Sequence, residues 1–187
     1  MRKLALFLLP ALVLALLTVV GTVFAQAEKA AGQEVKQEAP KVYEVGDTAP
    51  DFSLPNAITG STMALNKDIL GKDAKLIALT FMNTTCSACQ AEVSLLSDMA
   101  KKYGDKFKVC LIAVDMRGEK LVKAYNENYH YKVDYLLDPE FTLPPTFGFK
   151  YTPGLVLMDN KGKILYKKGG YVIADADVLI KEVKNRL

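Results

Sequence analysis

The chain is 187 residues long and 50% of its residues are apolar, which is enough for one domain with a substantial core and for extra segments at its ends. Its formal net charge is +3, and once the first 27 residues are set aside 22 Lys and Arg face 21 Asp and Glu, so the composition gives no reason to expect a nucleic-acid partner. Three cysteines are an odd number and too few for a scaffold held together by disulfides.

The N-terminus has the features of an export signal. A basic start, residues 1–3, precedes an uncharged run of 22 residues at 4–25. Ala25-Gln26-Ala27 matches the small-x-small pattern of a signal peptidase site, which favours cleavage after Ala27. The alternative is that residues 4–25 remain as a membrane anchor, because they are long enough to span a bilayer. Both interpretations place the rest of the chain outside the cytoplasm, in the periplasm or on the outer face of the cytoplasmic membrane.

Residues 28–42 mix Ala, Gln, Glu and Lys with few apolar side chains, so we expect a flexible tether there. The folded domain is predicted to cover residues 43–187. At its start, two short alternating stretches, at 52–54 and 62–65, are separated by turn-forming residues. They predict an N-terminal β-hairpin.

The rest of the domain alternates between strand and helix patterns. Residues 75–82 form a continuous apolar run, which is typical of a strand covered on both faces. A helix is predicted to start just after Thr85 and to stop at Gly104. The further elements predicted in chain order are a strand at 107–115, a helix at 119–128, an antiparallel hairpin of 154–159 and 163–168, and a helix at 175–186. This order is that of an α/β protein with a thioredoxin-like fold, in which helices flank a central mixed sheet.

Two cysteines, Cys86 and Cys89, lie at the predicted start of the first helix. A helix N-terminus stabilises a thiolate through its unpaired N–H groups and its macrodipole. Cys86 lies at the edge of the helix and Cys89 one turn inside it, so we expect Cys86 to attack a partner disulfide and Cys89 to resolve the mixed disulfide. A zinc site is the alternative for a CxxC pair. The remaining donors are Cys110, expected in the core, and a single histidine, His130, so no metal is predicted.

Four stretches of the chain occur in a distinctive order. They are "VGDTAPDFSL" at the domain entrance, "LIALTFMNTTCSACQAEVSLL" around the cysteine pair, Tyr151-Thr152-Pro153, and "GLVLMDNKGKIL" in the closing hairpin. They resemble exported thioredoxin-like thiol–disulfide oxidoreductases of the TlpA/ResA type, within the wider redoxin (AhpC/TSA) group. The resemblance extends over about residues 43–187.

The resemblance implies roles for further residues. Pro153 is expected to be a cis-proline beside the cysteine pair, and the backbone of Thr152 is expected to pair with a substrate strand. Thr85 replaces the aromatic residue that commonly precedes the first cysteine in this family, and we assign Thr85 and Thr152 to substrate binding. Glu92 falls where ResA-like proteins carry a glutamate close to the disulfide. It either tunes the cysteine pKa values or moves a proton, or it is a surface glutamate favoured by the helix dipole.

The function that the resemblance implies is exchange of a dithiol for a disulfide with exported protein substrates. Reduction is the expected direction, with electrons from a membrane thiol carrier and with apocytochrome c or a copper-site protein as substrate. No organic cofactor is implied. Two departures from the family pattern bear on the reduction potential: Ser87-Ala88 lies between the cysteines, and Thr80 takes the place of the buried aspartate of ordinary thioredoxins.

Two other functions remain open from the sequence. A thiol peroxidase would form a sulfenic acid on Cys86 and resolve it with Cys89, but Leu79 and Asn83 stand where peroxiredoxins carry Pro and Thr. A Cu(I)-binding thioredoxin-like metallochaperone would hold the metal between the two thiolates. Such proteins usually separate their cysteines by three residues and add a histidine.

Overall fold

The computed structural model describes residues 41–71 and 73–187. The predicted signal peptide or anchor at 1–27 and nearly all of the predicted tether at 28–42 lie outside these residues. Within the part of the chain that is described, no helix is both long and apolar enough to cross a membrane.

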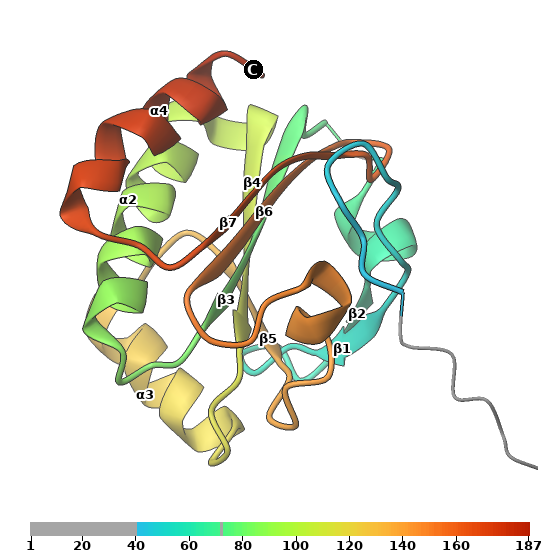
Figure 1. The fold of residues 1–187 in the computed structure, drawn as a ribbon. Helices are drawn as coiled ribbons and strands as arrows, with labels where there is room; N and C mark the ends of the chain where they lie inside the picture. Colours follow the sequence, from blue (N-terminus) through green and yellow to red (C-terminus); the bar gives the residue numbers. More distant parts are fainter. Residues whose placement is uncertain (1–40, 72) are drawn as a thin grey trace, which may run out of the picture. The chain divides into compact units, whose positions relative to one another are not determined.

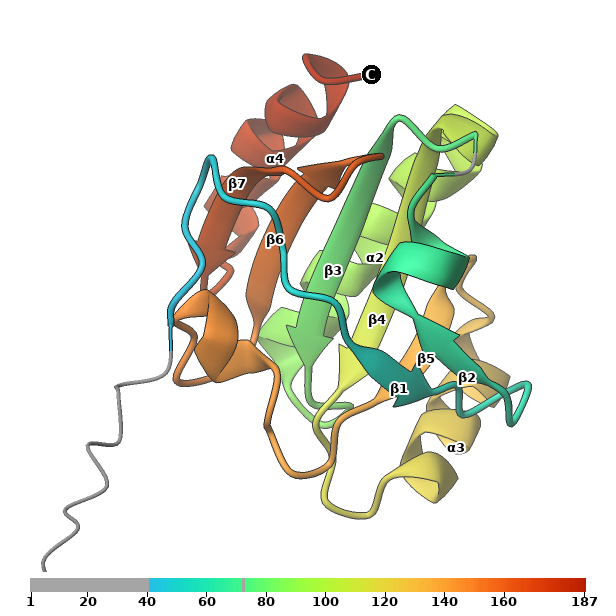
Figure 2. The same cartoon turned by 90° about the vertical axis from the view of Figure 1, so that its right-hand side faces the viewer.

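A five-stranded mixed sheet forms the centre of the fold (Figure 1). Its strands are β3 (Leu76–Met82), β4 (Phe107–Ala113), β5 (Asp134–Leu137), β6 (Gly154–Asp159) and β7 (Ile164–Gly169). They lie side by side in the order β5-β4-β3-β6-β7 (Figure 2). The first three run parallel, β6 runs antiparallel to β3, and β7 runs antiparallel to β6. The predicted mixed sheet is confirmed.

Helices cover one face of this sheet and the N-terminal hairpin covers the other (Figures 1 and 2). The helices are α2 (Ser87–Tyr103), α3 (Glu119–Tyr129) and α4 (Ala176–Lys184), and the hairpin is β1 (Ser53–Pro55) with β2 (Thr62–Ala64). Short helical turns connect the larger elements: η1 (Leu65–Ile69), η2 (Gly104–Lys106), η3 (Pro144–Phe147) and η4 (Ile173–Asp175).

Strand β3 separates two apolar cores because its side chains point alternately to the two faces of the sheet. Ile77, Leu79 and Phe81 are buried in the core beneath the hairpin and η3. Leu76 and Ala78 are buried in the core beneath α2 and α4. This burial on both faces fixes β3, and the segment that carries the cysteine pair follows directly from its last residue.

The sequence pattern does not predict β5. Its four residues contain only a three-residue apolar run, which is too short for a periodic signal. The strand forms because β4 pairs with it on one side and an isolated bridge from Asn56 to Leu136 pairs with it on the other. Tertiary pairing therefore determines this strand.

Candidate active site

The cysteine pair lies at the junction of β3 and α2, at the C-terminal edge of the parallel strands (Figure 1). Cys86 is the N-cap residue of α2, and its Sγ accepts a hydrogen bond of 3.3 Å from the backbone N–H of Cys89. Both residues are free thiols. Cys86 is partly exposed, whereas Cys89 is fully buried. The predicted difference in exposure is confirmed.

Burial raises the pKa of the Cys89 thiol to about 12, and the adjacent Cys86 sulfur adds to the rise. Hydrogen bonds from the backbone of Asn83 and from the side chain of Thr152 oppose this rise. Cys89 is therefore protonated at neutral pH, and only Cys86 is both accessible and placed at the helix N-terminus. This arrangement suits an attacking thiol followed by a resolving thiol.

The segment that faces the pair contains a cis peptide bond between Thr152 and Pro153, as the resemblance implied. Pro153 is buried and directly precedes β6, and the side chain of Thr152 is close enough to Cys89 to lower the pKa of its thiol. Thr85 is exposed on the turn that leads to Cys86, and its Oγ1 donates a 2.6 Å hydrogen bond to Oδ1 of Asn83. Thr152 and Thr85 both lie next to the pair.

The ring of Phe149 packs next to the Thr152–Pro153 segment. It packs over Gly154 and Gly169, which are cross-strand partners in β6 and β7, and it contacts Phe81 with ring centroids 5.7 Å apart. A Cβ added at Gly154 would lie 2.7 Å from the Phe149 ring, whereas a Cβ at Gly169 would lie 3.6 Å from it. The ring is 8% exposed, so it has little room to move away from Gly154.

We therefore expect Gly154→Ala to lower the free energy of unfolding by about 1–3 kcal/mol, the usual cost of overpacking a core. Gly169→Ala is the matched control, because it adds the same methyl group next to the same ring at an ordinary contact distance. Urea denaturation of both variants measures the difference. Equal effects of the two substitutions would contradict the importance of the close approach at Gly154.

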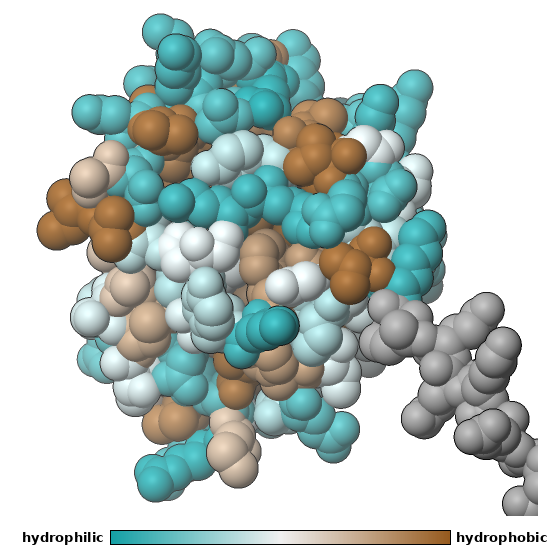
Figure 3. All heavy atoms as spheres, in the orientation of Figure 1, coloured by the Kyte–Doolittle hydropathy of each residue, from teal (hydrophilic) through white to brown (hydrophobic). Residues whose placement is uncertain are grey.

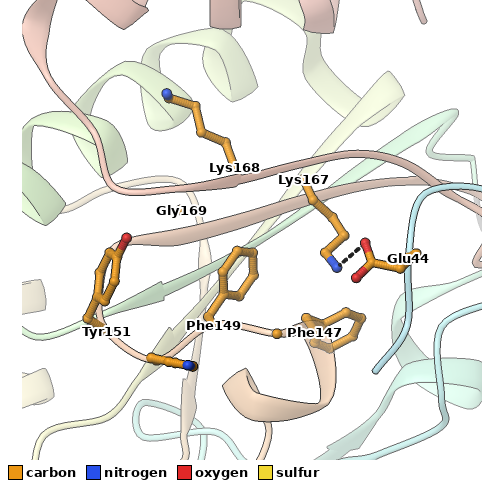
Figure 4. A pocket seen from close by; sticks show the side chains of 9 residues that line it. Glu44, Phe147, Phe149, Tyr151, Lys167, Lys168 and Gly169 are labelled. Atoms are coloured by element: carbon orange, nitrogen blue, oxygen red, sulfur yellow. Dashed lines mark hydrogen bonds and ion pairs between the residues drawn. The ribbon is translucent and has the colours of Figure 1, made fainter. Parts of the chain in front are cut away.

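A cavity of about 400 Å³ adjoins the same segment and has aromatic and basic walls (Figure 4). Figure 4 shows the ring of Phe149 between Tyr151 and Lys167. The ammonium group of Lys167 donates hydrogen bonds to the backbone oxygen of Tyr43, at 2.6 Å, and to Oε2 of Glu44, at 2.8 Å. Lys167 thereby ties the beginning of the described chain to β7.

Apolar side chains are exposed on the other side of the cysteine pair. Val172 and Ile173 are 62% and 84% exposed, and together with Tyr171 and the first turns of α2 they line a groove of about 350 Å³. Figure 3 shows this area in brown at the left edge of the molecule, where the chain from β7 to α4 runs. The region around the first turn of α2 is therefore partly apolar.

Glu92 is fully buried, so its interpretation as a surface glutamate is wrong. Its Oε2 accepts a 2.8 Å hydrogen bond from Oγ1 of Thr80, and its Oε1 has no hydrogen-bond partner. Burial raises the pKa of Glu92 to about 7, against smaller opposing effects of the Thr80 hydrogen bond and the charge of Lys168. Glu92 makes no direct hydrogen bond to either cysteine, and any effect on the pair acts over a longer distance.

The other metal-ligating residue types lie apart from the pair. Cys110 is fully buried in β4, as expected for a core residue, and burial raises its pKa. His130 is exposed at the C-cap of α3. Among residues 41–71 and 73–187, no three His, Cys, Asp or Glu side chains gather in a way that could hold a metal ion.

Sequence reasoning missed Asp115, a buried carboxylate that hydrogen-bonds the turn before Cys86. One signal pointed to it, because Asp115 closely follows the apolar run of β4 and therefore lies at the same sheet edge as the cysteine pair. The supporting role of Phe149 had no signal in the sequence pattern.

Comparison with known proteins gives a consistent result. The model of the AhpC/TSA family matches residues 45–167. Thiol-disulfide oxidoreductase ResA of Oceanobacillus iheyensis is 38% identical over 85 residues, which are 44% of this chain and 42% of that relative. ResA of Bacillus thuringiensis subsp. konkukian is 29% identical over 128 residues, which are 68% of this chain and 70% of that relative.

Solved structures extend the likeness to the whole fold. A protein from Chlorobium tepidum described as thiol:disulfide interchange protein DsbE has a TM-score of 0.68 and 26% identity, and the match covers 76% of this chain and 97% of the other. A protein from Neisseria meningitidis described as a thioredoxin has a TM-score of 0.63 and 27% identity, with 75% and 90% coverage. The thioredoxin-like fold expected from the order of strands and helices is confirmed.

Proposed function

The chain belongs to the AhpC/TSA family and is a thiol–disulfide oxidoreductase of the ResA type, and from this premise we propose that it exchanges its Cys86–Cys89 dithiol for disulfides of exported proteins. One observation carries the proposal. Cys86 is accessible at the N-terminus of α2, and Cys89 is buried one turn behind it. An attacking thiol and a resolving thiol need this asymmetry.

In the proposed direction the protein is a reductant. The Cys86 thiolate attacks one sulfur of the substrate disulfide, the S–S bond breaks, and the leaving substrate sulfur takes up a proton. Cys89 then loses its proton and attacks Cys86 Sγ, which releases the second substrate thiol. Two electrons have moved to the substrate, and the protein is left with a Cys86–Cys89 disulfide that a membrane thiol carrier reduces again.

The proposed roles of the neighbouring residues follow from their positions. Thr152, next to Pro153, pairs through its backbone with an extended substrate segment, and Thr85 contacts the same segment from the turn before Cys86. Glu92 titrates near neutral pH within one helical turn of Cys89, and we assign to it an electrostatic influence on the pair.

The proposed location is outside the cytoplasm, either in the periplasm or on the outer face of the cytoplasmic membrane. The basic start and the uncharged run at 4–25 support export, with residues 1–27 as a signal peptide or anchor and residues 28–42 as a tether. Apocytochrome c or a copper-site protein is the proposed substrate, by analogy with the TlpA/ResA type.

The reduction potential of the Cys86/Cys89 couple tests the direction. We expect a value near that of thioredoxin, about −270 mV, because a reductant must hold its electrons only weakly. The full-length protein is equilibrated in dithiothreitol or glutathione buffers and the alkylated thiols are counted by mass. A Cys110→Ala variant serves as the control that removes the third thiol from the count. A value near about −120 mV would make the protein an oxidant and overturn the proposed direction.

A further inference from the structure

Thr84 lies two residues before Cys86, and each of its polar groups takes part in a hydrogen bond. Its backbone N–H donates to both carboxylate oxygens of Asp115 at 3.1 Å, and its Oγ1 donates to Oδ1 of Asp115 at 2.6 Å. Its backbone oxygen accepts a 2.7 Å hydrogen bond from Nε2 of Gln90 in α2. Thr84 is therefore fixed both to the loop after β4 and to the helix that carries the cysteine pair.

Further hydrogen bonds within the turn from Asn83 to Cys86 connect Thr84 to the residue that carries the attacking sulfur. The side-chain oxygen of Asn83 accepts hydrogen bonds from the backbone N–H and the hydroxyl of Thr85, and its backbone oxygen accepts the N–H of Cys86 at 3.0 Å. Each residue between the end of β3 and Cys86 is thus bound to a neighbour. A movement of Thr84 must move Cys86 as well.

We propose that Asp115 is a positioning residue of the redox site, which clamps Thr84 and thereby holds Cys86 Sγ at the N-terminus of α2. Asp115 is 2% exposed and lies two residues after the end of β4, so its backbone is anchored close to a strand of the central sheet. The four residues between β3 and α2, of which Cys86 is the last, belong to no helix or strand that could fix their position. The inference rests on the proposed exchange by Cys86 and Cys89, and it names what sets the reactivity of that pair.

The position of the Cys86 sulfur determines how well its thiolate is stabilised. The unpaired N–H groups of a helix act only within the first turn, and the N–H of Cys89 already lies 3.3 Å from Cys86 Sγ. A small outward displacement weakens this contact and removes the sulfur from the region of positive potential. The reduced form then loses stability relative to the disulfide, and the thiolate fraction of Cys86 falls.

A purely structural role for Asp115 makes a different prediction, and the chain contains a matched control. Asp138 is 3% exposed and follows the neighbouring parallel strand β5. It accepts hydrogen bonds from the N–H and the hydroxyl of Thr142 at 3.0 and 2.7 Å and from the N–H of Leu143 at 2.9 Å. Asp138 is thus a second buried carboxylate that clamps a threonine, but its loop does not lead to the cysteine pair.

The test compares Asp115→Asn, Thr84→Val and Asp138→Asn in the full-length protein. Two quantities are measured: the equilibrium constant of the cysteine couple with dithiothreitol, and the rate at which iodoacetamide labels Cys86, followed by mass spectrometry. We expect Asp115→Asn and Thr84→Val to shift the equilibrium about tenfold toward the disulfide and to slow labelling about tenfold. Asp138→Asn should leave both quantities unchanged, although it lowers the free energy of unfolding. Thr84→Ser, which keeps the hydroxyl, should behave as the unaltered protein.

Three results would overturn the proposal. Equal changes in Asp115→Asn and Asp138→Asn would show a general effect of a buried carboxylate on stability. Faster labelling in Asp115→Asn with unchanged labelling in Thr84→Val would show that Asp115 acts through its charge rather than its clamp. Unchanged values in both Asp115→Asn and Thr84→Val would exclude any role in positioning. A failure of the proposed function is distinguishable from all of these, because the unaltered protein would then form no disulfide between Cys86 and Cys89 in the dithiothreitol equilibrium.

Discussion

Cys86→Ser is expected to abolish thiol–disulfide exchange, whereas Cys89→Ser is expected to accumulate the protein as mixed disulfides with its partners. The first variant lacks the accessible sulfur at the N-terminus of α2 that attacks the substrate in the proposed mechanism. The second variant keeps this sulfur but lacks the buried thiol to which we assign release of the substrate. The turnover of either variant should fall to the level of the uncatalysed reaction with a disulfide substrate.

Reduction of a model protein disulfide measures turnover, and non-reducing electrophoresis of exported proteins shows the trapped complexes. Cys110→Ala is the control, because it removes a thiol of the same chain that is fully buried in β4. Mixed disulfides that form at Cys89 in the Cys86→Ser variant, at a rate comparable with those at Cys86, would reverse the assigned roles. Turnover that survives in Cys86→Ser would place the reactive group elsewhere.

The stability of the protein is expected to decrease as the pH rises through the range in which Glu92 titrates. The pKa of Glu92 is about 7 in the folded protein and 4.5 in its ordinary state, so between these values the folded protein binds a proton that the unfolded chain releases. Raising the pH in this window therefore favours unfolding. The stabilisation is complete below about pH 4.5 and is lost above about pH 7, and its magnitude is about 3 kcal/mol.

Urea denaturation at a series of pH values tests this expectation against Glu92→Gln. The amide fills the same space and still accepts a hydrogen bond from Thr80, but it does not titrate. The difference in unfolding free energy between the two proteins should therefore change by about 3 kcal/mol from about pH 4 to about pH 8. Glu127→Gln, at an exposed position on α3, should leave the pH dependence unchanged. A constant difference between the unaltered protein and Glu92→Gln would contradict the raised pKa.

The local sequence predicted most of the elements on which the site depends. The apolar run at 75–82 became β3, the Gly104 stop signal ended α2, and the strand "GLVLMD" became β6 with the same limits. These features were predictable because each depends on contacts close in sequence or on burial that a periodic pattern records. The exposure of the two cysteines followed from their places on the helix.

Other parts of the site depend on contacts between residues far apart in the chain. The clamp joins Thr84 to Asp115 across 31 positions, and the sequence pattern indicates only that Asp115 lies at the same sheet edge, not that it binds Thr84. The packing of Phe149 could not be predicted for the same reason, because its ring lies against two glycines in different strands. Glu92 had two open interpretations, a role at the cysteine pair and a surface position, because helix spacing alone did not show that this side of α2 faces Thr80 of β3.

The first residues of the described chain pair with both outer strands of the large sheet. On one side, Gly46 and Asp47 exchange backbone hydrogen bonds with Ile164 of β7, and on the other the N–H of Ala57 donates to the backbone oxygen of Tyr135 in β5. An unpaired strand edge is a template on which further chains add and aggregate. By pairing with the start of β7 and with β5, a segment that carries no catalytic group shortens the exposed strand edges on which further copies of the protein could add. In the proposed function, an extended substrate chain adds at the loop of Thr152 rather than at these paired positions.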